Sequence, residues 1–486
     1  MLPFQEMGSA LIGGSWVQAS DGRHFDVANP FDATTLAQVA DCGAHDAEAA
    51  LSAASTAFDT WSTRTAAERS SLLLRWHDRL VQASETLART ISLELGKTIR
   101  DSRAEVSYGN GYVRWFAEEA RRVYGTTIPS PFPGRQLFVT REPVGVVAII
   151  TPWNFPYAML ARKIAPALAA GCTVVVRPAE DTPLTALYAA QLAIDAGIPP
   201  GVINVAPSSR ERVSELSDVW MRSDAVRKVS FTGSTPVGKG IAQRASTTLK
   251  RLSLELGGNA PFIVFDDADV DAAVQGAVAA KFRNSGQTCI SPNRFFVHQD
   301  LCAAFTDKLT KAVSALSVGD PSLESTDIGP LVNAAAVDKV QAHVQDAVDK
   351  GAKLLFGGQR LPQWGPLFFQ PTVLLGLTVG MRIFHEETFG PVIAVMPFST
   401  EAEVLDTANQ SQAGLAAYFY TRDSARIWRV GRRLRVGMVG VNEALISTEV
   451  APFGGVKDSG YGREGSYLGL DDYLETKYMC LGGLSR

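Results

Sequence analysis

Apolar runs of strand length alternate with longer helical stretches between residues 144 and 205. The apolar runs cover residues 144–150, 172–176 and 202–205, and the helical stretches cover residues 157–170 and 182–196. This alternation is typical of βαβ units, in which helices cover a parallel sheet. The segment therefore predicts an α/β fold.

A second α/β cycle follows Gly257. At 486 residues the chain is too long for one hydrophobic core, so we expect two or three domains. Helices dominate the first quarter, at residues 46–95 and 104–124. The second cycle has expected strands at 262–265 and 294–297 and expected helices at 269–282 and 301–315.

Cys289 ends a polar, glycine-containing run, residues 284–288, between an expected helix and strand of the second cycle. A cysteine is more often a small buried hydrophobe, but this run is typical of a loop where a thiol meets solvent or substrate. Glu255 lies 34 positions upstream, directly before Leu256 and two glycines. A thiol can attack a carbonyl, and a carboxylate can activate the water that releases the acyl group.

Asn154 follows the apolar run 144–150, in a turn just past the carboxyl end of the expected strand. Ligands of open α/β sheets bind at this edge. An amide there can donate a hydrogen bond to a developing oxyanion, although a turn asparagine often bonds its own backbone. Because Asn154 and Glu255 come from the first cycle and Cys289 from the second, we expect the chemistry in the cleft between them.

A glycine turn, Gly233 to Gly238, follows an expected strand at 228–231 and opens a helix. Backbone N–H groups at such a helix start attract a pyrophosphate. The turn lacks the G-x-G-x-x-G fingerprint, so it is a weak cofactor signal by itself.

The bulk properties exclude several classes of protein. A net charge of −4 and a pI near 6.0 argue against a nucleic-acid partner. Five scattered cysteines support neither a disulfide framework nor a metal site, and they fit a reducing compartment. The amino terminus has no leader pattern, and no apolar run has membrane-spanning length. We expect a cytoplasmic protein without a metal or a membrane partner.

Several segments together resemble the aldehyde dehydrogenase superfamily, in the family's order, from about residue 12 to 483. Further segments are similar to its succinate-semialdehyde dehydrogenase branch. The family segments are TPWNFP (151–156), FTGSTPVG (231–238), ELGGN (255–259), GQTC (286–289), EETFGP (386–391) and PFGGVKDSG (452–460). The branch segments are WFAEEARRVYG (115–125), FRNSGQTC (282–289), VGMVGVNEALIS (436–447) and KYMCLGG (477–483).

The resemblance implies a fold and domain boundaries. We expect a Rossmann-like dinucleotide-binding domain at 1–122 and 142–256 and an α/β catalytic domain at 257–455. A small bridging β-sheet from 123–141 and 456–486 would pair subunits into a dimer or tetramer. Residues 136–141 alternate like an exposed strand, and an uncovered edge strand can pair with another chain.

The resemblance also implies a non-acylating oxidation of an aldehyde to a carboxylate. Cys289 would form a thiohemiacetal whose oxyanion Asn154 and the Cys289 backbone N–H hold, hydride would pass to the nicotinamide, and Glu255 would activate water to hydrolyse the thioester. Lys163 matches a lysine that assists charge and proton handling, although an exposed helix lysine is nearly as good an interpretation.

Cofactor contacts follow from the same resemblance. Glu180 can accept hydrogen bonds from ribose hydroxyls and would repel a 2′-phosphate, whereas Arg177, which replaces the usual lysine, could bind that phosphate. We therefore expect NAD, with NADP as the alternative. The remaining residues expected to contact the dinucleotide are Thr151, Trp153, Gly233, Ser234, Gly238, Glu387 and Phe389.

Arg162, Arg283 and Ser447 match positions that grip the substrate carboxylate in the succinate-semialdehyde branch. The planar guanidinium suits a carboxylate in bidentate geometry, although surface salt bridges are the plainer role for helix arginines. Other substrates stay open: glutarate semialdehyde, another ω-oxo acid or an aromatic aldehyde. A more remote alternative is a non-catalytic binding or structural protein that reuses the fold.

Overall fold

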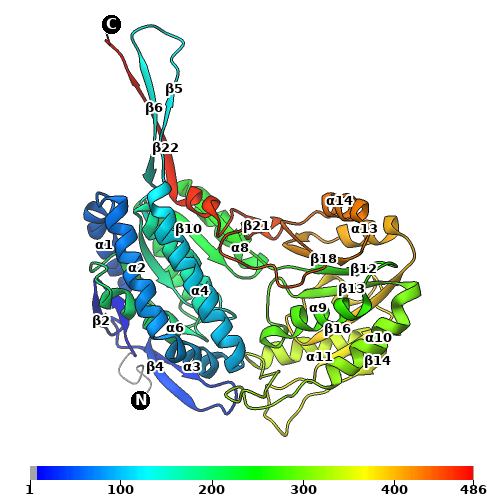
Figure 1. Ribbon diagram of the computed structural model, residues 1–486. Coiled ribbons are helices and arrows are strands. Elements are labelled where there is room, and N and C mark those ends of the chain that lie inside the picture. Colours follow the sequence, from blue (N-terminus) through cyan, green and yellow to red (C-terminus); the bar gives the residue numbers. More distant parts are fainter. Residues whose placement is uncertain (1–7, 485–486) are drawn as a thin grey trace.

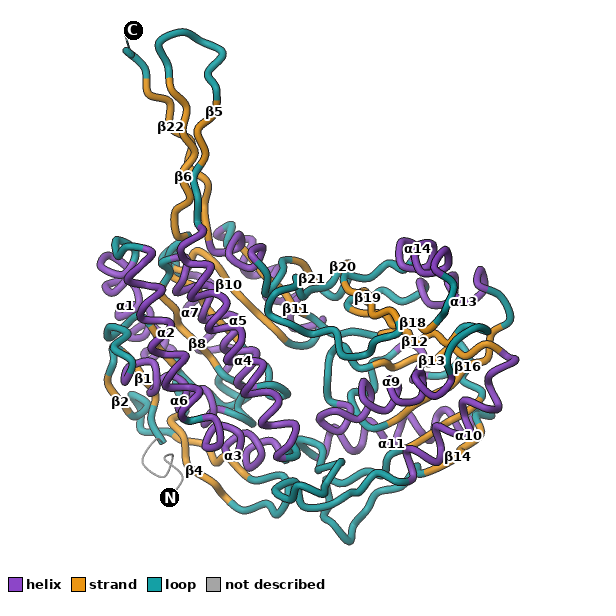
Figure 2. The backbone as a smooth tube through the Cα atoms, in the orientation of Figure 1, coloured by secondary structure: helices purple, strands orange, loops and turns teal. Residues whose placement is uncertain are grey.

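The computed structural model describes residues 8–484 as two lobes, each built on one large sheet, with a narrow arm rising from the first lobe (Figure 1). Residues 1–7 and 485–486, the ends of the predicted segments 1–122 and 456–486, lie outside the described residues. Helices and loops cover both sheets (Figure 2). None of the described helices combines the length and the apolar character needed to cross a bilayer.

The first sheet has the strand order β2-β1-β9-β8-β7-β10-β11-β21. Its core strands, from β9 to β11, are parallel, and β1, β2 and β21 are antiparallel at the edges. All residues of β7 and β8 are buried, as the continuous apolar runs predict. The strands are β1 (Ala10–Ile12), β2 (Ser15–Val17), β7 (Val146–Ile150), β8 (Thr173–Arg177), β9 (Ile203–Val205), β10 (Val226–Thr232), β11 (Arg251–Glu255) and β21 (Gly460–Tyr461).

The helices of this lobe confirm the expected order. The segment 46–95 forms three helices, of which the second is capped by Thr65 and the third ends at Gly96 in a left-handed conformation. The helices are α1 (Ala44–Trp61), α2 (Ala66–Gln82), α3 (Ser84–Leu95), α4 (Ile99–Glu119), α5 (Pro156–Ala170), α6 (Pro183–Asp195), α7 (Val213–Arg222) and α8 (Thr235–Ala245), and a hairpin of β3 (His24–Ala28) and β4 (Thr35–Ala40) stands apart.

The second sheet has the order β14-β15-β16-β13-β12-β18-β19 and is parallel except for β14. Its strands are β12 (Ala260–Val264), β13 (Pro292–His298), β14 (Lys353–Phe356), β15 (Thr372–Leu375), β16 (Val392–Phe398), β18 (Ala416–Tyr420) and β19 (Met438–Val441); a separate pair joins β17 (Ala413–Gly414) to β20 (Val456–Lys457). Its helices are α9 (Val270–Phe282), α10 (Gln299–Ser314), α11 (Ala334–Asp349), α12 (Arg382–His385), α13 (Glu401–Asn409) and α14 (Ser424–Arg433).

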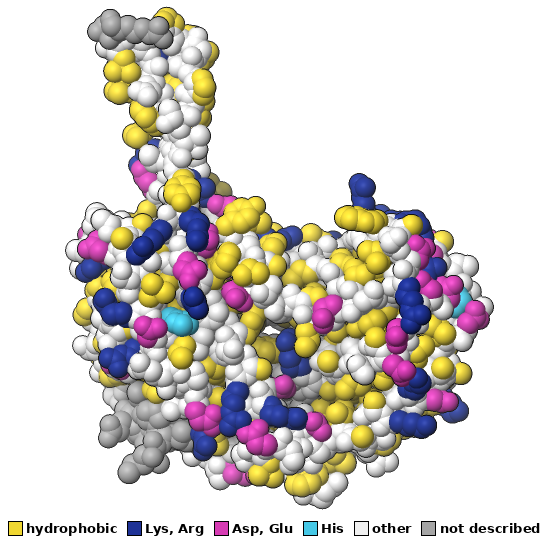
Figure 3. Space-filling view, viewed as in Figure 1, with side chains coloured by type: hydrophobic (Ala, Val, Ile, Leu, Met, Phe, Trp, Pro, Cys, Tyr) yellow, Lys and Arg dark blue, Asp and Glu magenta, His cyan; other side chains and the backbone are white. Residues whose placement is uncertain are grey.

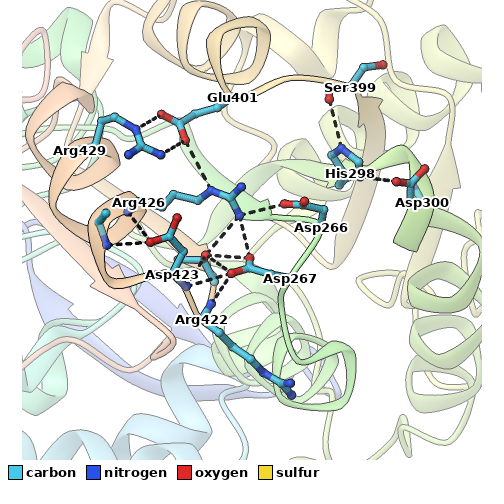
Figure 4. Close-up of polar contacts among 12 residues, drawn as sticks. Asp266, Asp267, His298, Asp300, Ser399, Glu401, Arg422, Asp423, Arg426 and Arg429 are labelled. Atoms are coloured by element: carbon cyan, nitrogen blue, oxygen red, sulfur yellow. Dashed lines mark hydrogen bonds and ion pairs between the residues drawn. The ribbon is translucent and has the colours of Figure 1, made fainter.

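A polar cluster fastens α14 to the second lobe (Figure 4). Arg426 contacts Asp266 at 2.9 Å and Asp267 at 2.7 Å, in the loop after β12. Glu401, at the start of α13, accepts hydrogen bonds from Arg429 Nε at 2.6 Å and from Arg429 Nη2 at 2.7 Å. Such a network is stronger than isolated surface ion pairs because the same charges are shared.

The arm is a three-stranded antiparallel sheet of β5 (Thr126–Ile128), β6 (Gln136–Pro143) and β22 (Leu474–Leu481). The sequence suggested an uncovered edge at residues 136–141. That expectation is wrong, because β22 pairs with β6 along its whole length and β5 pairs with its other side, so β6 is central. The predicted bridging segment 456–486 also divides, since β20 and β21 pair within the lobes and only β22 enters the arm.

Candidate active site

Cys289 lies where two cavities meet. It lines a cavity of about 350 Å³ together with residues of both lobes, and a second cavity of about 230 Å³ that is walled in part by α4. Met159 also lines both. A thiol in this position can reach ligands in both spaces, so one reacting group serves two binding sites.

The segment before Cys289 is a loop, as predicted, but it is buried. Asn284 and Ser285 have left-handed backbones, with φ of 51° and 54°, which non-glycine residues adopt at a cost in energy. The Asn284 side chain donates to the carbonyl of Gln287 at 3.2 Å, and Ser285 Oγ donates to the Gly329 carbonyl at 3.1 Å. These bonds fix the loop that presents the thiol.

Asn154 lies in the turn between β7 and α5, and its side chain points at the cysteine loop. Its Nδ2 donates to the Gln287 carbonyl at 3.0 Å, two residues before Cys289. Its own carbonyl accepts from Lys97 Nζ at 2.8 Å and from Asn284 Nδ2 at 3.0 Å. The amide therefore bonds across the site rather than within its own turn.

Glu255 ends β11 and lines the larger cavity with Asn154 and Cys289. Its side chain is buried, and neither carboxylate oxygen has a hydrogen-bond partner among the described residues. Burial, and then the negative charge of Glu464, raise the pKa of Glu255 well above its ordinary value. Burial therefore disfavours the ionised form of this carboxyl group.

Glu464 is a buried partner that the sequence analysis did not find. It forms ion pairs with Arg162 and Lys163. Burial opposes its ionisation, but these two cations lower the pKa of Glu464, so this member of the carboxylate pair carries the charge. Lys163 is buried, which excludes the exposed-lysine interpretation; it donates to Ser230 Oγ at 3.3 Å and lines neither cavity.

The Cys289 thiol is also held in its protonated form. Burial is the main cause, and it raises the pKa of Cys289 to about 12. Arg162 and Arg283 act in the opposite direction, whereas Glu387 and Glu255 add to the increase. The folded protein therefore disfavours the reactive thiolate.

The larger cavity collects most of the residues predicted to contact a dinucleotide. Trp153, Gly233, Ser234, Glu387 and Phe389 line it, and the Trp153 and Phe389 rings meet edge to face with centroids 5.5 Å apart. Burial raises the pKa of Glu387 to about 7, opposed by a hydrogen bond of 3.2 Å from the Gly258 N–H.

Other predicted cofactor residues lie outside this cavity. Thr151 is buried and donates its backbone N–H to the Arg177 carbonyl at 3.1 Å. Gly238 packs in the first turns of α8, where an added Cβ would come within 2.4 Å of Leu256 Cδ2. Glu180 lines a separate cavity of about 730 Å³ and accepts from Arg177 at 2.7 Å.

The smaller cavity contains all three predicted anion-binding residues, Arg162, Arg283 and Ser447. Arg162 is buried over the Phe453 ring at 4.1 Å, and neither its Nη1 nor its Nη2 has a hydrogen-bond partner in the described chain. Buried guanidinium donors without partners are costly, so a ligand that accepts from them is favoured here.

The comparisons with known proteins agree with this geometry. The sequence profile of the aldehyde dehydrogenase family matches residues 16–479. Succinate-semialdehyde dehydrogenase of Oryza sativa is 51% identical over 98% of this chain and 89% of that protein. The 3-sulfolactaldehyde dehydrogenase of Pseudomonas putida is 51% identical over 98% of this chain and 97% of that protein.

Solved structures are equally similar. Succinate-semialdehyde dehydrogenase from Burkholderia pseudomallei matches with a TM-score of 0.96 and 49% identity, over 98% of both chains. An NADP dependent enzyme of E. coli matches with a TM-score of 0.97 and 47% identity, over 99% of this chain and 100% of that chain. These matches confirm the predicted fold class.

Proposed function

The chain belongs to the aldehyde dehydrogenase family, and on that premise we propose that it oxidises succinate semialdehyde to succinate. One observation supports this choice most strongly: Cys289 separates a cavity suited to a dinucleotide from a cavity that carries two arginines. An aldehyde with an anion at its far end would reach the thiol with its carbonyl and the guanidinium groups with its anion.

In the proposed reaction the Cys289 sulfur, once deprotonated, attacks the aldehyde carbon. The Asn154 amide and the Cys289 backbone N–H hold the resulting oxyanion. When bound, the dinucleotide supplies the oxidant that turns the thiohemiacetal into a thioester. Glu255 then removes a proton from water, whose oxygen attacks the thioester carbon. The carbon–sulfur bond breaks, which releases the carboxylate product and returns Cys289 as the thiolate.

The residues of the larger cavity fit a nicotinamide dinucleotide. Ser234, the N-cap of the 11-residue helix α8, forms no side-chain cap bond within residues 8–484. The first N–H groups of the helix can therefore donate to a bound anion. The Trp153 and Phe389 rings supply an apolar wall, and the Glu387 carboxylate supplies acceptors for hydroxyl groups. These residues would hold the pyrophosphate and the nicotinamide ribose.

The anion at the far end of the substrate would bind Arg162, Arg283 and Ser447. A carboxylate matches the guanidinium fork with two parallel hydrogen bonds, and a sulfonate offers acceptors of the same charge. The likeness to a 3-sulfolactaldehyde dehydrogenase makes that sulfonate the second substrate to be tested. Both substrates belong to one class, short aldehydes with a terminal anion.

The test compares kcat/KM for succinate semialdehyde, glutarate semialdehyde, 3-sulfolactaldehyde, benzaldehyde and butanal. Butanal has the chain length of succinate semialdehyde without its carboxylate. We expect succinate semialdehyde to have the highest kcat/KM. Arg283→Ala should raise the KM for succinate semialdehyde at least tenfold, because one charged hydrogen bond contributes about 1.5–3 kcal/mol. The same variant should change the KM for butanal less than about twofold. Equal losses on both aldehydes would show a structural role for Arg283, and a preference for butanal in the natural enzyme would refute the substrate.

NAD is the proposed cofactor. Burial alone would raise the pKa of Glu180, but the charge of Arg177 outweighs this effect and the pKa is lowered. The ionised carboxylate can accept from ribose hydroxyls and repels a 2′-phosphate. Arg177 also donates from Nε to Ser208 Oγ and from Nη2 to the Ser208 carbonyl, so these two nitrogens are already engaged. We expect kcat/KM to favour NAD, and a tenfold preference for NADP would contradict this assignment.

The arm is proposed to pair subunits into a homodimer or homotetramer. Its strands β5 and β22 have open edges, and apolar side chains stand exposed along it (Figure 3). Exposed apolar residues of the arm include Ile128, Phe132, Tyr478, Met479 and Leu481.

All five cysteines are unpaired, which supports a reducing compartment such as the cytoplasm.

A further inference from the structure

A buried ion pair, Lys97 with Glu105, lies directly beneath the turn that carries Asn154. Both side chains are fully enclosed. Lys97 Nζ donates to the Asn154 carbonyl at 2.8 Å and sits 3.7 Å from the centre of the Phe155 ring. A buried charge is retained at a cost unless its contacts compensate, so the contacts of this pair indicate what it does.

Glu105 ties the pair to helix α5. Its Oε1 accepts from the N–H groups of Tyr157 at 2.9 Å and Ala158 at 3.1 Å, the first free donors of α5. The carboxylate therefore caps the helix from outside, while its other oxygen holds Lys97. The turn of Asn154 is fixed at its helical end by Glu105 and at its centre by Lys97.

Helix α6 provides an internal comparison. Glu94 caps it in the same way, accepting from the N–H groups of Leu184 at 2.9 Å and Thr185 at 3.1 Å. Both helices begin with proline, and both capping carboxylates are buried. Glu94 has no ion pair with a lysine or arginine among the described residues. The extra cation at α5 is therefore not needed for capping.

The Asn154 carbonyl is held from a second side by the cysteine loop. Asn284 Nδ2 donates to it at 3.0 Å, and the Asn284 backbone N–H donates to Asp101 Oδ2 at 2.7 Å. Asp101 and Glu105 both belong to α4. One helix thus fixes both the turn that presents the Asn154 amide and the loop that presents the thiol.

We propose that Lys97, held by Glu105, is a positioning residue that sets the Asn154 amide at the oxyanion of the Cys289 adduct. The role rests on the proposed aldehyde oxidation. Without the ammonium, the Asn154 carbonyl would lose one of its two donors and the turn could rotate. A displacement of about 1 Å at a catalytic group can reduce the rate about 100-fold.

The test is a double-mutant cycle between Lys97 and Asn154. Lys97→Met is combined with Glu105→Gln, which removes both charges together and leaves an amide oxygen to cap α5. With the natural Asn154, kcat/KM for succinate semialdehyde should fall about 10- to 100-fold. In an Asn154→Ala background the same change should cost less than about threefold, because the positioned amide is already absent.

Two readouts separate positioning from general damage. Alkylation of Cys289 by iodoacetamide forms no oxyanion, so its rate in the paired Lys97 and Glu105 variant should stay within about twofold of the rate in the natural protein. The Kd of this variant for NAD should not change. Glu94→Gln, the matched replacement of the capping carboxyl group at α6, should leave kcat/KM unchanged. If the paired variant does not fold, Lys97→Arg, which keeps the charge but moves the donor, takes its place in the same cycle.

Equal losses in both Asn154 backgrounds, an alkylation rate that falls with kcat/KM, or full activity of the Lys97 variants would each overturn the inference. These outcomes can be distinguished from failure of the proposed function. If the protein did not oxidise aldehydes, the natural enzyme would form no NADH from any of them, and the double-mutant cycle would have no starting rate to compare.

Discussion

At the scale of single residues, the reaction depends on two protons. Burial raises the pKa of the Cys289 thiol and of the Glu255 carboxyl group, so the folded protein disfavours the ionised form that each needs for its role. Glu464 keeps its negative charge through Arg162 and Lys163. The thiol must lose its proton before it attacks, and the Glu255 carboxyl group must be ionised before it can activate water.

The first prediction concerns the pH dependence of the thiol. A free cysteine has a pKa near 8.5, whereas burial raises the pKa of Cys289 to about 12. Because the folded protein disfavours the thiolate, iodoacetamide should react faster as pH rises, with no plateau below about pH 10. Stopped-flow alkylation without cofactor measures this, and saturation near pH 8 would contradict the assigned environment.

The sequence indicated the reactive residues more clearly than the buried residues that contact and charge the site, such as Glu464. Cys289, Asn154 and Glu255 each follow a strand or helix end within a recognisable segment, so their meeting in one cavity could be expected. Glu464 could not be found in this way. Its partner Lys163 is 301 positions away. The antiparallel pairing of β21 with β11 brings the segment of Glu464 to the first lobe.

At the scale of elements, the cofactor cavity depends on how closely α8 approaches β11. Gly238 lets the helix lie against Leu256, since a Cβ there would be 2.4 Å from a leucine methyl group. Gly238 is expected from the sequence to contact the cofactor, and that expectation stays a prediction. The structure adds a packing contact with Leu256 beside the cavity, which no local sequence pattern indicates.

The second prediction follows from this contact. Gly238→Ala should displace the start of α8 and weaken NAD binding at least tenfold, with about 1–3 kcal/mol lost in stability through overpacking. Gly240→Ala is the matched control, because an added Cβ at that position of the same helix meets nothing within 4 Å. Titration of both variants with NAD measures the difference. Equal affinities would mean that α8 does not set the cavity.

Apolar runs predict the buried parallel strands β7, β8, β9, β12 and β13, because such strands leave a clear pattern, whereas β15, β16, β18 and β19 of the second sheet were not expected from the sequence. The arm was less predictable. Its strand β6 looks like an edge in isolation, and only the pairing of Gln136 with Leu481 and of Pro143 with Leu474 makes it central. Pairing over such a separation leaves no local signal in the sequence.

At the scale of the whole molecule, two lobes enclose the site and the arm projects away from both (Figure 1). The arm has too few layers to bury its own apolar side chains, so these remain exposed. An isolated three-stranded ribbon of this kind gains stability by packing against another chain. The shape of the molecule thus favours self-association through the arm.

The third prediction tests that association. Replacing Tyr478 and Leu481 of β22, which are 59% and 50% exposed, by glutamate should convert the proposed dimer or tetramer into monomer. Light scattering during gel filtration measures the mass in solution. Trp428→Glu is the control, since this side chain is 75% exposed but lies on α14 of the second lobe. Loss of assembly with the control alone would move the interface away from the arm.

The central claim is that Cys289 carries the acyl group and that Glu255 releases it. Glu255→Gln should lower kcat about 10²- to 10⁴-fold, yet still form one equivalent of NADH per site on mixing with succinate semialdehyde and NAD. Acid quenching and mass spectrometry should then find a succinyl thioester on the peptide that contains Cys289. A missing burst, or an acyl group on another cysteine, would contradict the account.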